Sequence, residues 1–412
     1  TGVQTCALPI CDPEMVSEYG IAFMQGVQSE GLIATAKHFP GHGDTDSDSH
    51  IELPVLNHDY NRLDSVELIP FRRAIEGGIQ SIMSAHISFP KISNQPEIPG
   101  TLDENILGDI LMDSLKFDGV VVTDGLEMSG ITKKFSPGRA VVRALNAGAD
   151  IMLISPDIHT AISEVIAAVA QGEITVERIE ASYRKIVQWK QEAGLFDQNN
   201  QIDIHALDQV LNANAHQAEA DRIARESITI LKDDKNLLPL DPTKYENILL
   251  VSIADDDYGN TGSPFARALR DYHPNVTFSV FDDRSDEDDV QKILRQARAA
   301  DLVIIGSFIS LRFAESIQLP RKHASFLRRL MSLGKNTVLT MFGNPYLVNE
   351  LQETDVHVMA WSNHTIQMRA AAPTLFGAAD VAGKLPIEIP GMYSVGDGID
   401  YSQTALRYGQ PE

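Results

Sequence analysis

The sequence is poor in the residues that mark several common classes of protein. Only two of its 412 residues are cysteines, and both, Cys6 and Cys11, lie among the first eleven positions. We therefore expect neither a disulfide framework nor a cysteine metal site to support the fold. No apolar run approaches the roughly 18 residues that a transmembrane helix requires, so the sequence predicts no membrane span.

Basic side chains are also scarce. The chain has 34 lysines and arginines against 57 aspartates and glutamates, which gives a formal net charge of −23. Such a charge repels phosphate backbones, so nucleic acid is excluded as an expected partner. No glycine-rich phosphate-binding fingerprint follows any predicted strand, which argues against nucleotide binding. An apolar fraction of 43% with 22% charged residues is typical of a folded globular chain.

The first eleven residues, TGVQTCALPIC, have no helical or strand periodicity. They resemble a translated sequencing adapter, and we expect residues 1–11 to be an artefactual segment; an irregular N-terminal loop is the alternative. From residue 12 the pattern changes, because D-P-E combines a capping carboxylate, a proline at the first helical position and an acidic first turn. A helix is predicted to begin there.

Short β-rich runs then alternate with amphipathic stretches, the pattern of parallel β/α units. The predicted strands of this region lie at residues 32–39, 79–87, 119–125 and 149–156, and the predicted helices at 63–75, 104–115, 138–147 and 176–193. We assign residues 12–196 to this first domain.

A polar segment at residues 197–215 is predicted to be a linker, and a second alternating series follows at 216–412. Its predicted strands lie at residues 228–232, 247–253, 277–281, 301–308, 336–343 and 356–362. This series predicts a separate α/β sandwich domain.

Polar residues stand at the carboxyl ends of the first three predicted strands, namely His38, His86 and Asp124. The carboxyl ends of parallel strands form the active-site face of a β/α barrel. The alternative interpretation is that polar residues simply mark strand ends.

The densest group of reactive side chains is KHFPGHGDTDSDSH at residues 37–50. Its D-x-D-x-D pattern is similar to a calcium loop, but Ser49 and Val55 occupy the positions where such a loop needs glycine and glutamate. A zinc site made of histidines from this segment is chemically feasible, although the spacing matches no familiar ligand pair. The third interpretation is acid/base catalysis, in which Asp48 orients His50 and stabilises its charged form. A structural hydrogen bond between the two would look the same.

Asp124 ends the run V-V-V-T-D-G, so a carboxylate follows an apolar strand body. A rigid strand end suits a nucleophile, because attack geometry must be held closely. An aspartate that caps the next helix would have the same sequence pattern. A carboxylate nucleophile with a separate proton donor suits retaining glycoside hydrolysis, here with a histidine as the donor.

Three segments together resemble the bacterial β-N-acetylglucosaminidases of glycoside hydrolase family 3. They are KHFPGHGDTDSDSH, MSAH at residues 83–86 and FDGVVVTDGLEM at 117–128. The resemblance extends through ARESITILKDDKNLLPL at 224–240 and GKLPIEIP at 383–390, and covers residues 12–396.

The resemblance implies a (β/α)₈ barrel followed by an α/β sandwich, a carbohydrate substrate, no metal and no organic cofactor. It implies that Asp124 is the nucleophile, that Asp48 and His50 form the acid/base dyad, and that Lys37 and His38 hold sugar hydroxyls. His86 is expected to face the same pocket as a substrate-binding residue. The dyad favours a terminal β-linked N-acetylglucosamine of muropeptides or chitin fragments as the substrate.

In the family the barrel begins well before the KHFPGHG strand, so we expect only the C-terminal half of the barrel here. We expect this chain by itself to fold poorly and to lack activity, because a half barrel leaves two strand edges unpaired. A β-glucosidase, an N-acetylglucosaminide phosphorylase, a hexosaminidase in which the substrate's own acetamido group attacks, and a non-catalytic carbohydrate-binding protein remain alternatives.

Overall fold

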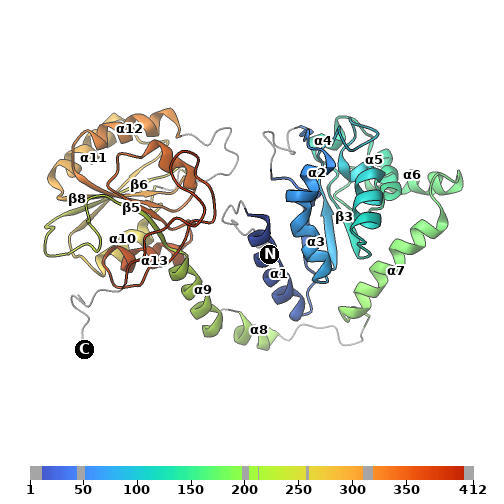
Figure 1. Ribbon diagram of the computed structural model, residues 1–412, viewed down its shortest axis with the longest axis horizontal. Helices are drawn as coiled ribbons and strands as arrows, with labels where there is room; N and C mark the ends of the chain where they lie inside the picture. The colour runs from blue at the N-terminus through green and yellow to red at the C-terminus, as the bar shows by residue number, and fades with distance from the viewer. Residues whose placement is uncertain are drawn as a thin grey trace. The chain divides into compact units, whose positions relative to one another are not determined.

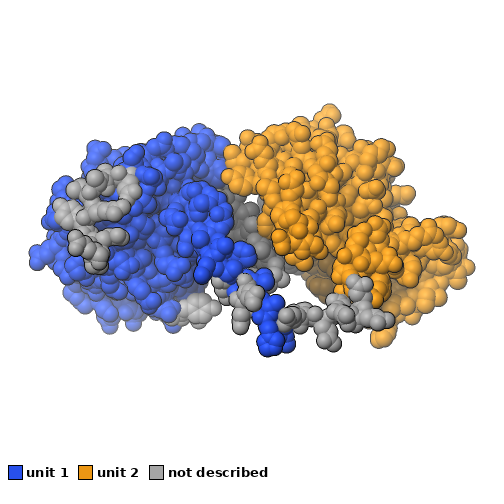
Figure 2. All heavy atoms as spheres, turned by 90° about the horizontal axis from the view of Figure 1, so that it is seen from below, with its two compact units in different colours: residues 1–11, 203–412 blue, residues 12–202 orange. Residues whose placement is uncertain are grey.

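The computed structural model describes residues 12–43, 52–196, 204–211, 213–256, 259–309 and 319–402. Two compact units make up the chain, one of residues 12–202 and the other containing residues 203–412 (Figure 2). Each unit has its own sheet and its own helices (Figure 1). The two-domain α/β fold class predicted from the sequence is confirmed.

The first unit is built on a four-stranded sheet in which every neighbouring pair is parallel, in the order β1-β2-β3-β4. The strands are β1 (Thr35–Phe39), β2 (Ser81–Ser84), β3 (Val120–Gly125) and β4 (Ile151–Leu153). All four lie within the predicted stretches. Because the strands are parallel, their carboxyl ends meet at one edge of the sheet.

Helices connect these strands and cover the sheet. The helices are α1 (Pro13–Ser29), α2 (Tyr60–Arg62), η1 (Leu63–Glu67), α3 (Leu68–Glu76), η2 (Gly100–Leu102), η3 (Asn105–Ser114), α4 (Ser129–Thr132), α5 (Pro137–Ala147), α6 (Ile158–Ala170) and α7 (Val176–Glu192). The Asp12 carboxylate accepts a hydrogen bond from the backbone N–H of Glu14 at 2.9 Å, which confirms the predicted start of α1. Helix α6 was not predicted, and η1 and η3 are π-helical instead of α-helical.

A buried carboxylate links α7 to the sheet through ion pairs. Asp150, whose side chain is 1% exposed, directly precedes β4. It pairs with Arg178 Nη1 at 3.2 Å and Lys185 Nζ at 3.1 Å, both on α7, and accepts from the backbone N–H of Val121 at 3.0 Å. A buried charge is tolerated only when it is paired and hydrogen-bonded in this way.

The second unit contains a six-stranded sheet in the order β5-β10-β9-β8-β6-β7. The strands are β5 (Thr229–Asp233), β6 (Ile248–Ile253), β7 (Val276–Phe281), β8 (Leu302–Ser307), β9 (Asn336–Met341) and β10 (Val356–Met359). Every one of them overlaps a predicted strand. Only β5 runs antiparallel to its neighbour, β10, within this sheet.

Helices cover both faces of this sheet, so the unit is a three-layer sandwich (Figure 1). The helices are α8 (Ile204–Val210), α9 (Asn214–Ser227), α10 (Ser263–Arg270), α11 (Glu287–Ala299), α12 (Arg321–Met331), η4 (Pro345–Glu350) and α13 (Thr365–Leu375). Helices α9, α10 and α13 contribute to one apolar core, and α11 and α12 contribute to the other. Helix α8 lies within residues 197–215, and the predicted domain boundaries there stay a prediction. Among the described residues, no helix is both long and apolar enough to cross a membrane.

Candidate active site

The carboxyl-terminal edge of the four-stranded sheet brings together most of the side chains that the sequence singled out. Lys37 and His38 are the third and fourth residues of the five-residue strand β1. His86 follows β2 by two residues, and Asp124 is the penultimate residue of β3. Asp48 and His50 fall in residues 44–51, which lie outside the described residues. The structure therefore shows the edge that carries the predicted nucleophile, and leaves the predicted dyad as a prediction.

Two of these side chains stand at irregularities in the strand ladder. Lys37 is opposite Met83 but Phe39 is opposite Ser84, so His38 is an extra residue in β1. A second shift occurs in β3 between Val122 and Gly125, the interval that contains Asp124. Bulges re-aim side chains and are common beside active sites. No pattern in the sequence indicates either bulge.

The two oxygens of the Asp124 carboxylate have different surroundings. Oδ1 accepts a hydrogen bond from the backbone N–H of Gly125 at 2.8 Å, whereas Oδ2 lies 3.5 Å from Nε2 of His38. The side chain is 24% exposed. The next helix, α4, has Met128 as its N-cap, so Asp124 is not a helix-capping residue. One oxygen is thus held by the backbone and the other faces the histidine.

His38 is uncharged at neutral pH. Burial lowers the pKa of its imidazole to about 4, because the charged ring loses its hydration. Asp124 opposes this shift, whereas Lys37, His42 and His86 lower the pKa further. Oδ2 of Asp124 therefore lies 3.5 Å from a neutral ring, which does not form an ion pair with it.

His86 is fully buried, and both of its ring nitrogens contact protein atoms. Nε2 lies 2.9 Å from the carbonyl oxygen of Gly125, and Nδ1 lies 2.8 Å from Oγ1 of Thr101. Burial lowers the pKa of this imidazole as well. The sequence predicted that His86 faces the pocket. In the structure it is 0% exposed and contacts the Gly125 carbonyl and Thr101, and the predicted substrate-binding role stays a prediction.

Thr101 is a member of this cluster that the sequence analysis missed. It lies on η2, is 0% exposed, and accepts a hydrogen bond from Oγ of Ser84 at 2.9 Å. Threonine is a frequent core residue with no characteristic spacing to the other site residues. Only the packing of η2 under the end of β2 identifies it.

No group of three or more potential metal-ligating side chains occurs within the described part of the chain. Among the described residues, this edge of the first unit brings together Asp124, His38 and His86.

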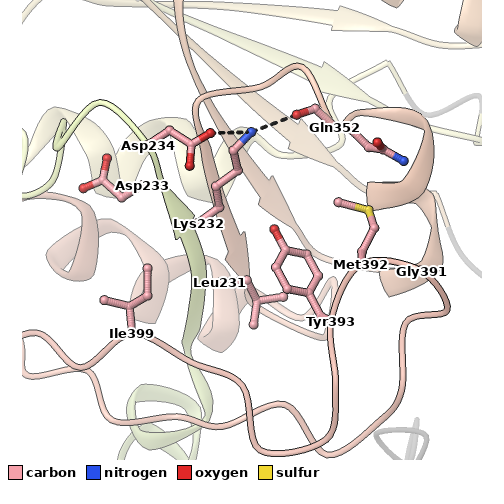
Figure 3. A pocket seen from close by; sticks show the side chains of 9 residues that line it. All are labelled: Leu231, Lys232, Asp233, Asp234, Gln352, Gly391, Met392, Tyr393 and Ile399. Atoms are coloured by element: carbon pink, nitrogen blue, oxygen red, sulfur yellow. Dashed lines mark hydrogen bonds and ion pairs between the residues drawn. The ribbon is translucent and has the colours of Figure 1, made fainter.

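A pocket of about 540 Å³ in the second unit provides a contrast (Figure 3). Its central lysine, Lys232, donates to the backbone oxygens of Gln352 and Thr354 at 2.8 Å and pairs with Asp234 at 3.0 Å. All three ammonium protons are therefore used within the protein. Asp233, which also lines this pocket, accepts hydrogen bonds from the protein at both carboxylate oxygens.

Comparison with known protein families agrees with the division into two units. Residues 11–189 match the glycosyl hydrolase family 3 N-terminal domain, and residues 228–409 match the glycosyl hydrolase family 3 C-terminal domain. The chain belongs to glycoside hydrolase family 3. The resemblance stated from the sequence motifs is confirmed.

The similar proteins include a solved glycoside hydrolase family 3 β-N-acetylglucosaminidase from Paenibacillus sp. str. FPU-7. That structure matches with a TM-score of 0.79 and 30% identity over 91% of this chain and 71% of that chain. A Beta-N-acetylglucosaminidase/beta-glucosidase of Cellulomonas fimi is 30% identical over 267 residues, 63% of this chain and 46% of the relative. A Beta-hexosaminidase of Methylobacillus flagellatus is 37% identical over 143 residues, 35% of this chain and 40% of the relative. The chain spans less than half the length of these two curated relatives.

Proposed function

We propose that the protein is a retaining β-N-acetylhexosaminidase that removes terminal β-linked N-acetylglucosamine through a covalent glycosyl-aspartate. Asp124 attacks the anomeric carbon, and the Asp48 and His50 pair first protonates the leaving oxygen and then activates water. Lys37 and His38 bind hydroxyl groups of the sugar. The proposed substrates are muropeptides or chitin-type oligosaccharides, and no metal or organic cofactor takes part.

The observation that carries this proposal is the asymmetric environment of the Asp124 carboxylate. Gly125 N–H holds Oδ1 at 2.8 Å, so the rotamer of the side chain is restrained, while Oδ2 remains partly exposed beside His38. A nucleophile needs this combination of a fixed orientation and an accessible oxygen. Because the His38 imidazole is neutral, no ion pair with this ring competes with attack by Oδ2.

The acid/base role of His50 rests on the D-S-H sequence and on the family. A carboxylate two residues from an imidazole stabilises the protonated ring and keeps its pKa near neutral pH, where proton transfer is efficient. The names of the relatives support an N-acetylhexosamine substrate, since β-hexosaminidase and β-N-acetylglucosaminidase recur among them. The second name of the Cellulomonas fimi relative makes a β-glucoside the natural comparison substrate.

The test is hydrolysis of matched aryl glycosides by the full-length protein, because we expect the half barrel by itself to lack activity. We expect faster turnover of the N-acetyl-β-glucosaminide than of the β-glucoside, and NMR should show that the sugar is first released as the β-anomer. Added phosphate should leave the rate and product unchanged. An α-anomer as first product, or a preference for the glucoside, would contradict the proposal; formation of a sugar 1-phosphate would indicate a phosphorylase.

A further inference from the structure

We propose that His86 is a positioning residue that fixes the orientation of the Asp124 carboxylate through the Gly125 peptide. This inference rests on the proposed function, because it gives the buried histidine a part in the attack by Asp124. His86 itself touches no substrate in this account. Its effect passes through the backbone of Gly125, from the carbonyl of the Gly125–Leu126 peptide to the N–H of the Asp124–Gly125 peptide.

The hydrogen-bond partners determine where the protons lie. A carbonyl oxygen only accepts hydrogen bonds, so the contact between His86 Nε2 and Gly125 O at 2.9 Å requires a proton on Nε2. In the neutral ring Nδ1 then has a lone pair, and the Thr101 hydroxyl lies 2.8 Å away. The one proton of this hydroxyl has two acceptors within reach, Nδ1 of His86 and the carbonyl oxygen of Ala85 at 3.0 Å. Thr101 in turn accepts from the Ser84 hydroxyl at 2.9 Å. His86 is therefore held between Thr101 and Gly125.

Both backbone polar groups of Gly125, its N–H and its carbonyl, make hydrogen bonds to site residues. Its N–H donates to Oδ1 of Asp124 at 2.8 Å, and its carbonyl accepts from His86. The residue lies at the end of the bulged part of β3, where the ladder to β4 resumes at Leu153. The Gly125 carbonyl also accepts from the backbone N–H of Met128 at 3.2 Å, and His86 is its one side-chain partner among the described contacts. Without His86, only the longer backbone hydrogen bond would hold this carbonyl. The carboxylate would then turn, and Oδ2 would leave its position beside His38.

Burial separates this role from that of a sugar-binding residue. His86 is 0% exposed and has a protein partner at each ring nitrogen. His38 is the contrasting case, because its side chain is 26% exposed and its Nε2 faces the nucleophilic oxygen. We therefore expect substitutions of the two histidines to change kcat and KM in different ways.

The kinetic test compares His86→Leu and His86→Gln in the full protein. Leucine removes the donor to Gly125, and we expect kcat to fall about 100-fold, the scale of a 1 Å misplacement, with KM nearly unchanged. Glutamine carries an N–H near the position of Nε2 and should restore part of kcat. The matched control is His323→Leu, since His323 is also fully buried and contacts a carbonyl, Ala254 O at 2.9 Å, in the other unit. The control should leave kcat unchanged.

A rise in KM with unchanged kcat in His86→Leu would overturn the proposal and show direct sugar binding. An effect on kcat no larger than that of His323→Leu would overturn it as well. If the leucine variant does not fold, Thr101→Val and Thr101→Ser replace it. The valine variant removes the hydroxyl beside Nδ1 and should lower kcat, and serine should retain the activity.

Two NMR measurements test the inference without any substrate. The ¹⁵N shifts of His86 in the parent protein should show the Nε2–H tautomer, and a proton on Nδ1 instead would overturn the proposal. Asp124 raises the pKa of His38, so Thr101→Val should lower the His38 titration midpoint as the carboxylate turns away. An unchanged midpoint would contradict the positioning role. If the parent protein hydrolyses no N-acetylglucosaminide, the proposed function fails, and these two measurements still decide the positioning of Asp124.

Discussion

The carboxyl ends of β3 and β5 can be compared directly, because each carries an aspartate, Asp124 as the penultimate residue of β3 and Asp233 as the last residue of β5. At the end of β3, Asp124 uses one oxygen on Gly125 N–H and presents the other to His38. At the end of β5, Asp233 accepts from Leu237 N at 2.7 Å and from Leu238 N and the Tyr401 hydroxyl at 3.0 and 2.8 Å.

The two carboxylates differ in how many of their oxygens accept hydrogen bonds from the protein. Both oxygens of Asp233 stabilise a turn, so this residue is structural. Asp124 has an oxygen left for a reaction, and it stands at a bulge in an otherwise parallel ladder. The parallel pairs in the second unit have no register shift. In the second unit the register shift lies in the antiparallel β10–β5 pair, between His357 and Val358. Asp124 therefore stands within a shifted parallel ladder with one oxygen partly exposed, while both oxygens of Asp233 accept hydrogen bonds from the protein.

The largest expected effect comes from Asp124→Asn. Asparagine preserves the shape and the hydrogen bond to Gly125 but is no nucleophile, so we expect kcat to fall by at least about 10⁴-fold with unchanged thermal stability. Turnover of an aryl N-acetyl-β-glucosaminide and a melting curve measure the two effects. Residual activity within tenfold of the parent would make Asp124 as structural as Asp233.

Next in size is Asp150→Ala, which removes the buried carboxylate between β3, β4 and α7. Arg178 and Lys185 would lose their shared partner, and we expect the first unit to lose about 3 kcal/mol of stability. Calorimetry that resolves the two units should show only one transition shifted. If both transitions move equally, the two units do not unfold independently.

The sequence predicted the strands well and the contacts between their ends poorly. All ten strands overlap predicted stretches, because β-rich apolar runs between turns are a local signal. Three other features depend on which strands become neighbours. They are the antiparallel direction of β5, the bulges at His38 and Asp124, and the Thr101 contact. Strand-end polarity singled out Asp124, His38 and His86 alike, and only the packing separates the buried His86 from the other two, whose roles stay predictions.

A third prediction concerns pH. The pKa of His38 is lowered by burial to about 4, so between pH 4 and the unfolded value near 6.5 the unfolded chain binds more protons than the folded one. The stability that His38 contributes is present above about pH 6.5 and declines as the pH falls toward 4. NMR titration should give the midpoint, and Asp124→Asn should lower it further. A midpoint near 6.5 would show that the ring is not desolvated.

Asp233→Asn is the matched change at the structural aspartate. In contrast to Asp124→Asn, we expect it to lower the stability and to leave kcat unchanged. An amide group would face one of the backbone N–H donors, which costs about 2 kcal/mol, and kcat should stay at the parent value. Chemical denaturation and the same glycoside assay measure this. Loss of activity at full stability would place Asp233 in the reaction and remove the contrast between the two strand ends.

The smallest effect is expected on the outer face of α6, where Ile158, Ile162 and Ile166 form a stripe that is 53–64% exposed. Replacing the central residue by glutamine, Ile162→Gln, should change the free energy of unfolding by less than about 0.5 kcal/mol. Ala168 on the same helix is 3% exposed, and Ala168→Gln should be far more destabilising. A large effect of Ile162→Gln would show that this stripe is covered in the folded protein.

The most direct test of the central claim is covalent trapping of the nucleophile. The protein is incubated with the 5-fluoro analogue of an N-acetyl-β-glucosaminyl fluoride, digested, and analysed by mass spectrometry. We predict that the sugar mass is found on the peptide of β3, at Asp124, and that Asp124→Asn prevents labelling. Turnover of the aryl glycoside without any label at Asp124, or a label on another carboxylate, would contradict attack by this residue.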